Sequence, residues 1–219
     1  MNSTKIKMTV LSVIGAAAIS MLSTAALAQD APAPVAPADA AAAEYVAVTR
    51  CSWCHGPQGN SISPIYPALA GQKAWYILEQ LQFFKAQTRA DPYARGYMWG
   101  MAAQLDDTQM NALADYFSKQ APFGGQAVPF SNGDVARGKS VYTEGVAANG
   151  VAPCSACHQD DASGNDQFPR LAGQHASYLL KQLRAFNTGS RNQAVMNGIV
   201  ATLQPDDMKA VAAYLESLH

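Results

Sequence analysis

The sequence has little charge and no strong imbalance between acidic and basic residues. Charged residues make up 14% of the 219 positions, and the formal net charge is −1. Nucleic-acid-binding proteins present a basic surface, so this composition argues against that class. Because 49% of the residues are hydrophobic, the chain can bury a core, which also excludes a disordered polymer.

Cysteine is equally scarce, and its few copies do not form the scattered framework of a disulfide-rich protein. The four cysteines form two tight pairs, and a histidine directly follows each pair: Cys51, Cys54 and His55 in the first half, and Cys154, Cys157 and His158 in the second. The chain therefore carries the pattern C-x-x-C-H twice.

The N-terminus holds an apolar run after a positive start. Lys5 and Lys7 precede an apolar stretch over 8–22, and the small-residue site Ala-Leu-Ala follows at 26–28. These features predict a cleaved signal peptide over 1–28 and export to the periplasm. An uncleaved membrane anchor is the alternative, but the stretch is short for a bilayer span. Cleavage would leave 13 basic and 16 acidic side chains, a formal charge of −3.

The two halves of the chain repeat each other in the same order. The matched segments are CSWCH with CSACH, PALAGQ with PRLAGQ, and MWG with MNG. The matched single residues are Tyr76 with Tyr178, Gln80 with Gln182, Phe84 with Phe186, Arg89 with Arg191, Leu105 with Leu203, Met110 with Met208, and Tyr116 with Tyr214. Preserved order with only short length differences indicates a tandem duplication.

Each half is predicted to be mainly helical. Apolar residues at helical spacing predict a helix over 74–87 and its repeat around 179–186, and a last helix in each half with Met110 or Met208 facing the core. A further helix is expected over 134–143, with a shorter counterpart at 43–49. The predicted organisation is a signal peptide (1–28), an Ala/Pro-rich linker (29–43), a first domain (44–120), an interdomain linker (121–133) and a second domain (134–219).

The doubled C-x-x-C-H motif predicts two covalently bound haems. In this motif the two thiols form thioethers with one edge of the haem, and the adjacent histidine binds the iron. We therefore expect Cys51, Cys54, Cys154 and Cys157 to bind the haems, with His55 and His158 as iron ligands. A thioredoxin-type dithiol would need a βαβ context, zinc knuckles would each be incomplete, and plain disulfides remain an alternative in an oxidising compartment.

The repeat also selects a second iron ligand in each half. His175 aligns with Lys73, and His219 is the last residue, so neither histidine recurs. Met98 aligns with Met196, whereas Met101 aligns with Ile199, which cannot bind iron. Filling of the core is the alternative role for a methionine. We expect Met98 and Met196 as the ligands, since His/Met ligation suits an electron carrier.

Prolines and glycines after each histidine suggest supporting roles. The carbonyls of Pro67 and Pro169 are candidates to accept from the second ring nitrogen of each histidine. Gly71 and Gly173 would suit a close approach of the chain to the macrocycle, with an ordinary Pro/Gly turn as the alternative.

These motifs resemble the class I cytochromes c, and their duplication resembles the diheme cytochrome c4 family. The resemblance runs from about Glu44 to His219 and rests on CSWCHGPQGN, YPALAGQ, GYMWGMAAQL and LADYF with their partners CSACHQ, FPRLAGQ, VMNGIVATL and VAAYL. It implies an all-α fold of two tandem cytochrome c domains, each wrapped around one covalently bound haem. It further implies a periplasmic carrier of single electrons to a respiratory terminal oxidase.

The expected partners are redox proteins, such as a respiratory oxidase, a cytochrome bc1-type donor or a dehydrogenase, with peripheral membrane association also allowed. The alternative is a cytochrome subunit of a periplasmic dehydrogenase complex. A diheme redox enzyme is a weaker alternative, because catalysis at iron needs an open position and acid–base groups over it. The segment from Arg89 to Met98 is four residues longer than its repeat and rich in aromatics, which predicts a different potential for the first haem.

Overall fold

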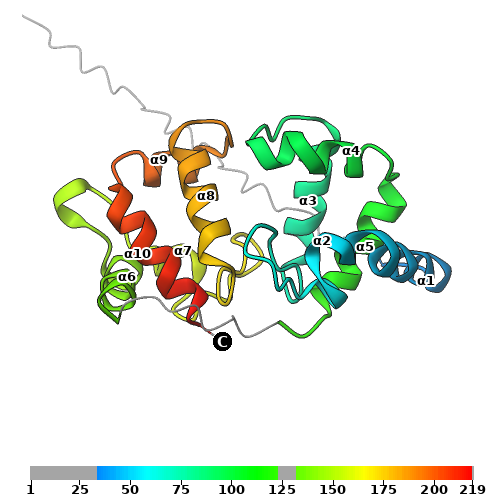
Figure 1. The fold of residues 1–219 in the computed structure, drawn as a ribbon, viewed down its shortest axis with the longest axis horizontal. Helices are drawn as coiled ribbons and strands as arrows, with labels where there is room; N and C mark the ends of the chain where they lie inside the picture. Colours follow the sequence, from blue (N-terminus) through cyan, green and yellow to red (C-terminus); the bar gives the residue numbers. More distant parts are fainter. Residues whose placement is uncertain (1–33, 123–131, 219) are drawn as a thin grey trace, which may run out of the picture.

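The computed structural model describes residues 34–122 and 132–218, which form two helical lobes joined through the chain (Figure 1). The first lobe contains α1 (Pro37–Val46), a π-helical turn (Ala47–Cys51), α2 (Ser52–His55), a 3-10 turn (Pro57–Gly59), α3 (Ala74–Lys85), a second π-helical turn (Ala94–Met98), α4 (Trp99–Ala102) and α5 (Asp107–Ser118). The second lobe contains α6 (Asn132–Glu144), a 3-10 turn (Ala147–Asn149), α7 (Ser155–His158), α8 (Ala176–Asn187), α9 (Ala194–Val200) and α10 (Pro205–Glu216).

The helical fold class expected from the sequence is confirmed. Within the described ranges the extended backbone amounts to one isolated bridge, between Val146 and Val151. None of the described helices is long and apolar enough to cross a membrane. The predicted signal peptide over 1–28 and most of the predicted linker over 121–133 lie outside the described residues.

The helix boundaries follow local sequence signals. α5 begins with a capping box, in which the Asp106 side chain accepts from the Gln109 N–H and the Gln109 side chain accepts from the Asp106 N–H. α10 begins with Pro205 at its first position, where the missing N–H leaves no intrahelical bond unmade. The last helix predicted in each half is therefore present, and each begins at a local start signal.

The first helix is longer than the sequence analysis predicts. α1 begins at Pro37, inside the stretch expected to be a linker, and the helical path continues through the π-turn into α2. Alanine has the highest helix propensity, and Pro37 presets the first turn. Ala43 and Ala47 are each only 3% exposed and pack in the first core, so this Ala-rich segment contributes to the lobe.

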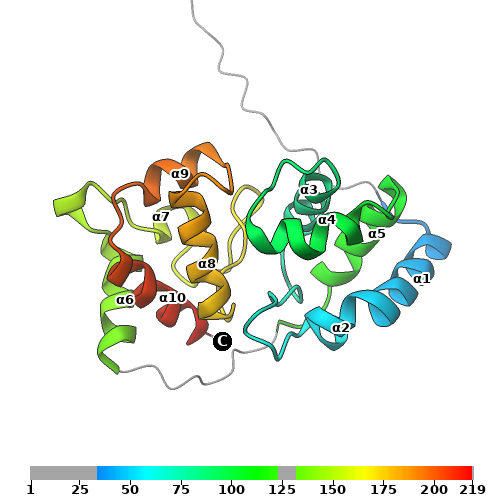
Figure 2. The ribbon, with the colours of Figure 1, turned by 45° about the horizontal axis from the view of Figure 1, so that its top comes forward.

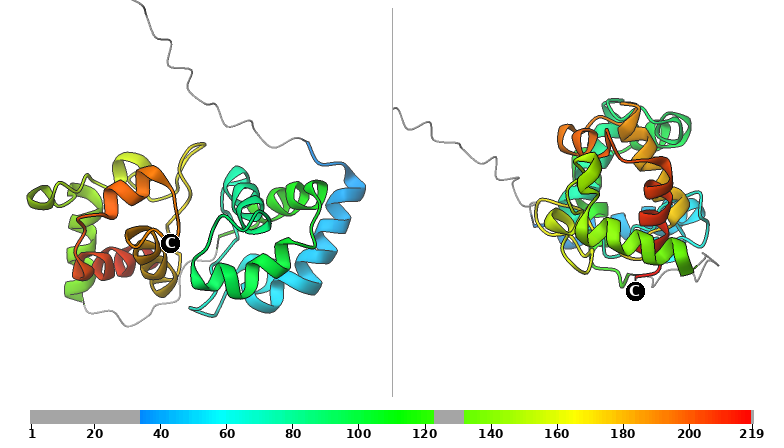
Figure 3. Two further views of the ribbon diagram at one scale, coloured as in Figure 1. Left: turned by 90° about the horizontal axis from the view of Figure 1, so that it is seen from above. Right: turned by 90° about the vertical axis from the view of Figure 1, so that its left-hand side faces the viewer.

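Each lobe has its own apolar core beneath its last helix. In the first core Met110 is 1% exposed and packs with Leu113 and Phe117 of α5, and in the second Met208 is 3% exposed and packs with Val211 and Tyr142. Both methionines therefore fill the cores, as predicted. Figure 3 shows the two lobes as separate helical units when the molecule is seen from above.

The crossing of α6 and α10 depends on a glycine. A Cβ added to Gly138 would clash with the carbonyl group of Ala210 and lie 2.8 Å from Cβ of Tyr214. Glycine at this position lets the two helices approach backbone to backbone.

The lobes meet along α3 and α8, which face each other in the middle of the molecule (Figures 1 and 2). Two glutamines form reciprocal bonds across this contact. Gln72 Nε2 donates to the Arg170 carbonyl and Gln72 Oε1 accepts from the Arg170 N–H, each at 2.9 Å. Gln174 makes the same pair of bonds with Ala68, also at 2.9 Å. Equivalent residues of the two repeats therefore make equivalent hydrogen bonds across the interface between the lobes.

Candidate haem-binding sites

A cavity of about 1170 Å³ extends through both lobes and exceeds the usual range of single-ligand pockets. The predicted site residues that line it are Cys51, Cys54, His55, Met98, Cys154, Cys157, His158 and Met196. The fold therefore brings every site residue chosen from the sequence to one continuous apolar space.

A sharp backbone turn follows each C-x-x-C-H helix. Gly56, directly after His55, has φ +75°, and a Cβ there would clash with the Asn60 carbonyl. In the second lobe Gln159 occupies the same conformation with φ 71°, an uncommon state for a residue with a side chain. The turn reverses the chain, so that the next segment returns over the histidine.

This return places the proline carbonyls against the histidines, as predicted. His55 Nδ1 lies 2.9 Å from the Pro67 carbonyl oxygen, and His158 Nδ1 lies 3.0 Å from that of Pro169. A carbonyl can only accept, so Nδ1–H donates in both. Burial lowers the pKa of both histidines, although the proline bonds oppose it, and the rings are therefore neutral. Their Nε2 atoms make no hydrogen bond within the described structure, which suits a metal ligand.

The thiols lack the properties of a redox dithiol. All four cysteines are free, and burial raises the pKa of Cys51 and Cys154 to about 11. A thioredoxin-type thiol has a lowered pKa, because the thiolate is the reactive form. The cysteines are instead half-buried at the cavity wall, where a thioether to an apolar cofactor would be shielded from water.

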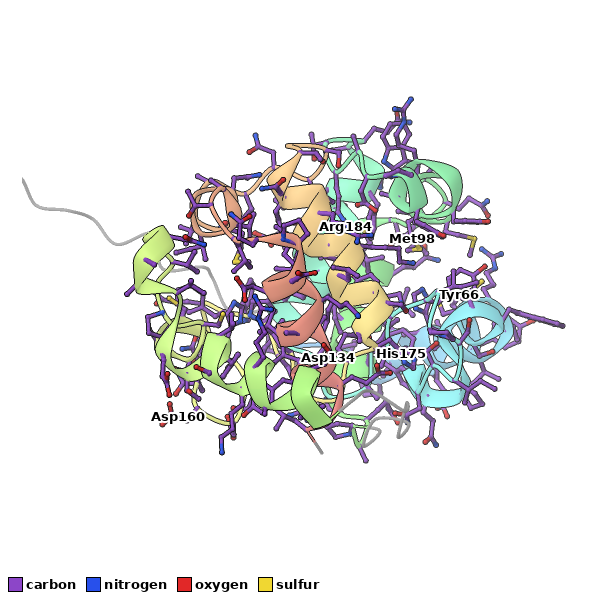
Figure 4. All side chains as sticks on the ribbon, turned by 60° about the vertical axis from the view of Figure 1, so that its left-hand side comes forward. Tyr66, Met98, Asp134, Asp160, His175 and Arg184 are labelled. Atoms are coloured by element: carbon purple, nitrogen blue, oxygen red, sulfur yellow. The ribbon has the colours of Figure 1, made fainter. Side chains whose placement is uncertain are left out.

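The two predicted methionine ligands line the cavity from short helical segments. Met98 ends the π-helical turn and packs beside Phe84 and Trp99, and Met196 lies in α9 against the second core. Figure 4 shows Met98 above Tyr66 in the first lobe. Met101 lines the cavity as well and is 40% exposed, so the choice between Met98 and Met101 depends on the repeat.

The first site has aromatic surroundings that the second lacks. The ring of Tyr66 meets His55 edge-on at 6.3 Å and Tyr97 at 6.1 Å, and Tyr97 stacks on Tyr93. In the second lobe the described ring contact of His158 is with Phe168, at 5.8 Å. Phe168 occupies the position that matches Tyr66, so the aromatic difference expected between the two sites lies in Tyr93 and Tyr97 of the longer segment.

Two buried arginines join the sites at the lobe interface. Arg89 and Arg191 are 6% and 7% exposed. Gln80 Oε1 accepts from both guanidinium groups at 2.8 and 3.0 Å, and Gln182 Oε1 does the same at 2.7 and 2.9 Å. Asp91 forms an ion pair with Arg89 at 2.8 Å. The two arginines and the two glutamines are repeat matches for which the sequence predicted no role, although paired polar residues beside an apolar helix stripe are a usable signal.

The positive charge of this arginine cluster bears on whether the cavity could hold a haem. Within the described structure Arg191 forms no ion pair; its hydrogen bonds go to the Tyr76 hydroxyl and the two glutamines, and its guanidinium lies over the Phe186 ring. Glu79 is close enough for Arg191 to lower its pKa against the effect of burial. Because no carboxylate contacts the buried guanidinium of Arg191 directly, the cluster favours an anionic group beside it. Haem carries acidic propionates on an otherwise apolar body. The apolar walls, the neutral histidines and this surplus positive charge all fit such a group.

The predicted role of Gly71 and Gly173 is wrong. Neither glycine lines the large cavity. Both have positive φ, of 67° and 71°, and their N–H groups donate to the last helices, at Phe117 and Leu215. A Cβ on Gly71 would clash with Pro122. They are turn residues that tie the loop to α5 and α10, which matches the alternative of an ordinary Pro/Gly turn.

Comparison with known proteins places the chain among electron-transfer haem proteins. The protein-family model described as cytochrome c matches residues 40–120 and 135–219. Cytochrome c4 of Azotobacter vinelandii is 39% identical over 192 residues, covering 83% of this chain and 90% of the relative. The structure of cytochrome c4 from Acidithiobacillus ferrooxidans is 40% identical with a TM-score of 0.72, covering 77% of this chain and 98% of the other.

A relative with a different name is similar to this chain over most of its length. The thiosulfate dehydrogenase electron acceptor of Thiomonas intermedia is 34% identical over 185 residues, covering 82% of this chain and 83% of the relative.

Proposed function

Because this chain belongs to the cytochrome c family, in its two-haem cytochrome c4 branch, we propose that it carries single electrons between redox proteins of the periplasm. Each domain holds one covalently bound haem c group, which supplies a one-electron couple when bound. The chain's own residues attach the haems, set their environment and shield them from water.

We assign the site residues as the sequence analysis chose them. Cys51 and Cys54 attach the first haem, and Cys154 and Cys157 attach the second. His55 and Met98 are the iron ligands of the first domain, and His158 and Met196 are those of the second. The supporting observation is the pair of Nδ1–H bonds to Pro67 and Pro169, which fix both rings with Nε2 free for a metal.

Arg89 and Arg191 would hold the acidic groups of the haems between the domains. Their guanidinium groups share the acceptors Gln80 and Gln182. A change of charge at one haem would therefore alter the hydrogen bonds of the arginine beside the other haem. This arrangement suits a two-site carrier, because the two cofactors would share one electrostatic environment.

The test of this function is haem content with reversible redox behaviour. Intact mass should show two haems on the mature chain, and a spectroelectrochemical titration should show two one-electron steps. Met98→Ala and Met196→Ala should each lower one potential by on the order of 0.1 V, within the ~0.8 V range set by axial ligands. Met101→Ala is the matched control and should leave both steps unchanged. A mature chain with fewer than two haems would refute the proposal.

The location, the domain boundaries and the absence of catalysis belong to the same proposal. We propose a signal peptide at 1–28, a first domain that runs from the start of α1 at Pro37 to residue 120, a second domain over 134–219, and a periplasmic protein without enzymatic activity. N-terminal sequencing of the mature protein tests the cleavage site. Carbon monoxide binding to the reduced protein at neutral pH would indicate an open iron position and contradict the role of a pure carrier.

A second candidate is the electron-accepting subunit of a dehydrogenase complex, such as one that oxidises thiosulfate. The relative of Thiomonas intermedia supports it, because that protein is named as such an acceptor. Co-purification of a catalytic subunit, with reduction of the haems on addition of its substrate, would favour this role. Rapid oxidation by membranes containing a terminal oxidase, without such a subunit, would favour the free carrier.

A further inference from the structure

The segment 61–68 of the first domain, here called the proximal loop, is held largely by the second domain. It follows the turn at Gly56 and carries the Pro67 carbonyl that accepts from His55. Three of its other carbonyls accept from side chains of the second domain: Ser61 from His175 Nε2 at 2.8 Å, Pro64 from the Ser177 hydroxyl, and Ile65 from Lys181 Nζ at 2.8 Å. Gln174 additionally binds both the N–H and the carbonyl of Ala68.

His175 has an unusual pair of neighbours for a buried histidine. Its Nε2 faces the Ser61 carbonyl oxygen, and its Nδ1 lies 3.1 Å from Glu216 Oε1. Neither acceptor can donate while Glu216 is ionised, so satisfying both requires a proton on each ring nitrogen. The second Glu216 oxygen accepts the Ala176 N–H at 3.0 Å. With an ionised Glu216, the geometry therefore fits a buried imidazolium at His175, which joins α10 and α8 of the second domain to the first.

The charge of His175 has one titratable partner among the described residues that face it. Glu216 of α10 is 3% exposed, as is His175, and the group that faces the ring from the first domain is the uncharged Ser61 carbonyl. The hydrogen bond to Glu216 raises the pKa of His175 against the effect of burial. Figure 4 shows His175 at the N-terminal end of α8.

The contact that the first domain makes with the matching loop of the second domain lacks these cationic donors. Lys73 occupies the position that matches His175, and its side chain makes no hydrogen bond or ion pair in the described structure. In the second domain the matching loop is the segment 163–170. Gln72 binds the backbone of Arg170 in this loop, and the Asn165 carbonyl accepts from Trp75 Nε1 at 3.2 Å. The two loops occupy equivalent positions in the repeat, and the cationic donors contact only the loop of the first domain among the described residues.

We propose that His175 is a positioning residue of the second domain for the haem site of the first. It fixes the proximal loop at Ser61 and thereby holds the Pro67 carbonyl against His55, which sets the orientation and basicity of that ring. This inference rests on the proposed haem ligation. The two ideas fail separately, because the order of the loop is measured independently of the haem potentials.

The pH dependence follows from the direction of the shift. A histidine whose pKa is raised in the folded state stabilises that state fully below its unfolded value of about 6.5. The stabilisation is lost as the pH rises through the folded pKa. Above it, one ring nitrogen loses its proton and opposes a lone pair of Ser61 or Glu216, and the loop loosens.

The first test is hydrogen exchange of the holoprotein at pH 6, read by mass spectrometry. In His175→Gln, peptides covering 61–68 should exchange roughly tenfold faster or more, the scale of one lost charge-assisted hydrogen bond. Peptides covering 163–170 should be unchanged. Lys73→Gln is the matched control at the repeated position and should leave both loops as in the native protein. Equal acceleration in both loops, or none in either, would overturn the proposal.

The second test is the pH profile of the two potentials. In the native protein, one of the two should change as His175 loses its proton. Glu216→Gln should move this change to lower pH while keeping an acceptor for Ala176, and His175→Gln should abolish it. Identical pH profiles in all variants would refute the positioning role. If His175→Gln fails to incorporate haem, the profile of Glu216→Gln decides alone, whereas a native protein lacking two haems refutes the proposed function instead.

Discussion

Replacing Gly138 with alanine should destabilise the second domain by about 2 kcal/mol. The new Cβ would clash with the Ala210 carbonyl group and lie 2.8 Å from Tyr214 Cβ, whereas ordinary contacts begin at 3.4 Å. Backbone cannot rotate away as a side chain can, so α6 and α10 must separate. Overpacking of this kind costs up to ~3 kcal/mol, and the higher helix propensity of alanine offsets ~1 kcal/mol.

The assay is guanidinium unfolding of the holoprotein followed by circular dichroism, with thermal unfolding as a second measurement. A loss of this size should lower the Tm of the second domain by roughly 8–16 °C. Gly198→Ala is the matched control, because no atom lies within 4 Å of its added Cβ and it also lies in a helix of that domain. A Gly138→Ala protein as stable as the native one would show that the close crossing is not required.

Four further substitutions test other parts of the structure. Arg191→Met should lower both haem potentials by on the order of tens of millivolts, because a buried cation that favours the reduced state is removed, and unchanged potentials in a redox titration would contradict this. Asp106→Ala should destabilise the first domain by about 1 kcal/mol through loss of the capping box, measured by denaturant unfolding, with Asp107→Ala as a control outside the box. Gln174→Ala should raise hydrogen exchange at Ala68 and Gln72→Ala at Arg170, since each removes two bonds from one loop, and an effect on the opposite loop alone would be inconsistent with the observed pairing.

Short-range patterns carried most of the successful prediction. The C-x-x-C-H motif is local, and helix starts at Asp106 and Pro205 depend on neighbouring residues alone. The proline carbonyls were also accessible, because the repeat marked the same residue type at nearly the same distance after each histidine. The ligand assignments at Met98 and Met196 remain predictions.

Features that depend on tertiary partners were missed or misjudged. Sequence reasoning set His175 aside because it does not recur, yet its neighbours Ser61 and Glu216 lie 114 and 41 positions away. The Ala-rich segment over 29–43 looked like a linker, since nothing in its composition shows that Ala43 packs in a core. Gly71 was predicted to approach the macrocycle, but it contacts Pro122 and Phe117 instead. These contacts could not be predicted, because both residues are distant from Gly71 in the sequence.

The reciprocal glutamine bonds have a consequence for assembly. Gln72 binds the backbone at Arg170 as Gln174 binds it at Ala68, so the two domains meet as two subunits of an isologous dimer would. Every polypeptide then offers surfaces that another copy can satisfy equally well. Shortening the segment between the domains should favour a domain-swapped dimer with the same contacts over pairing within one polypeptide, detectable by light scattering.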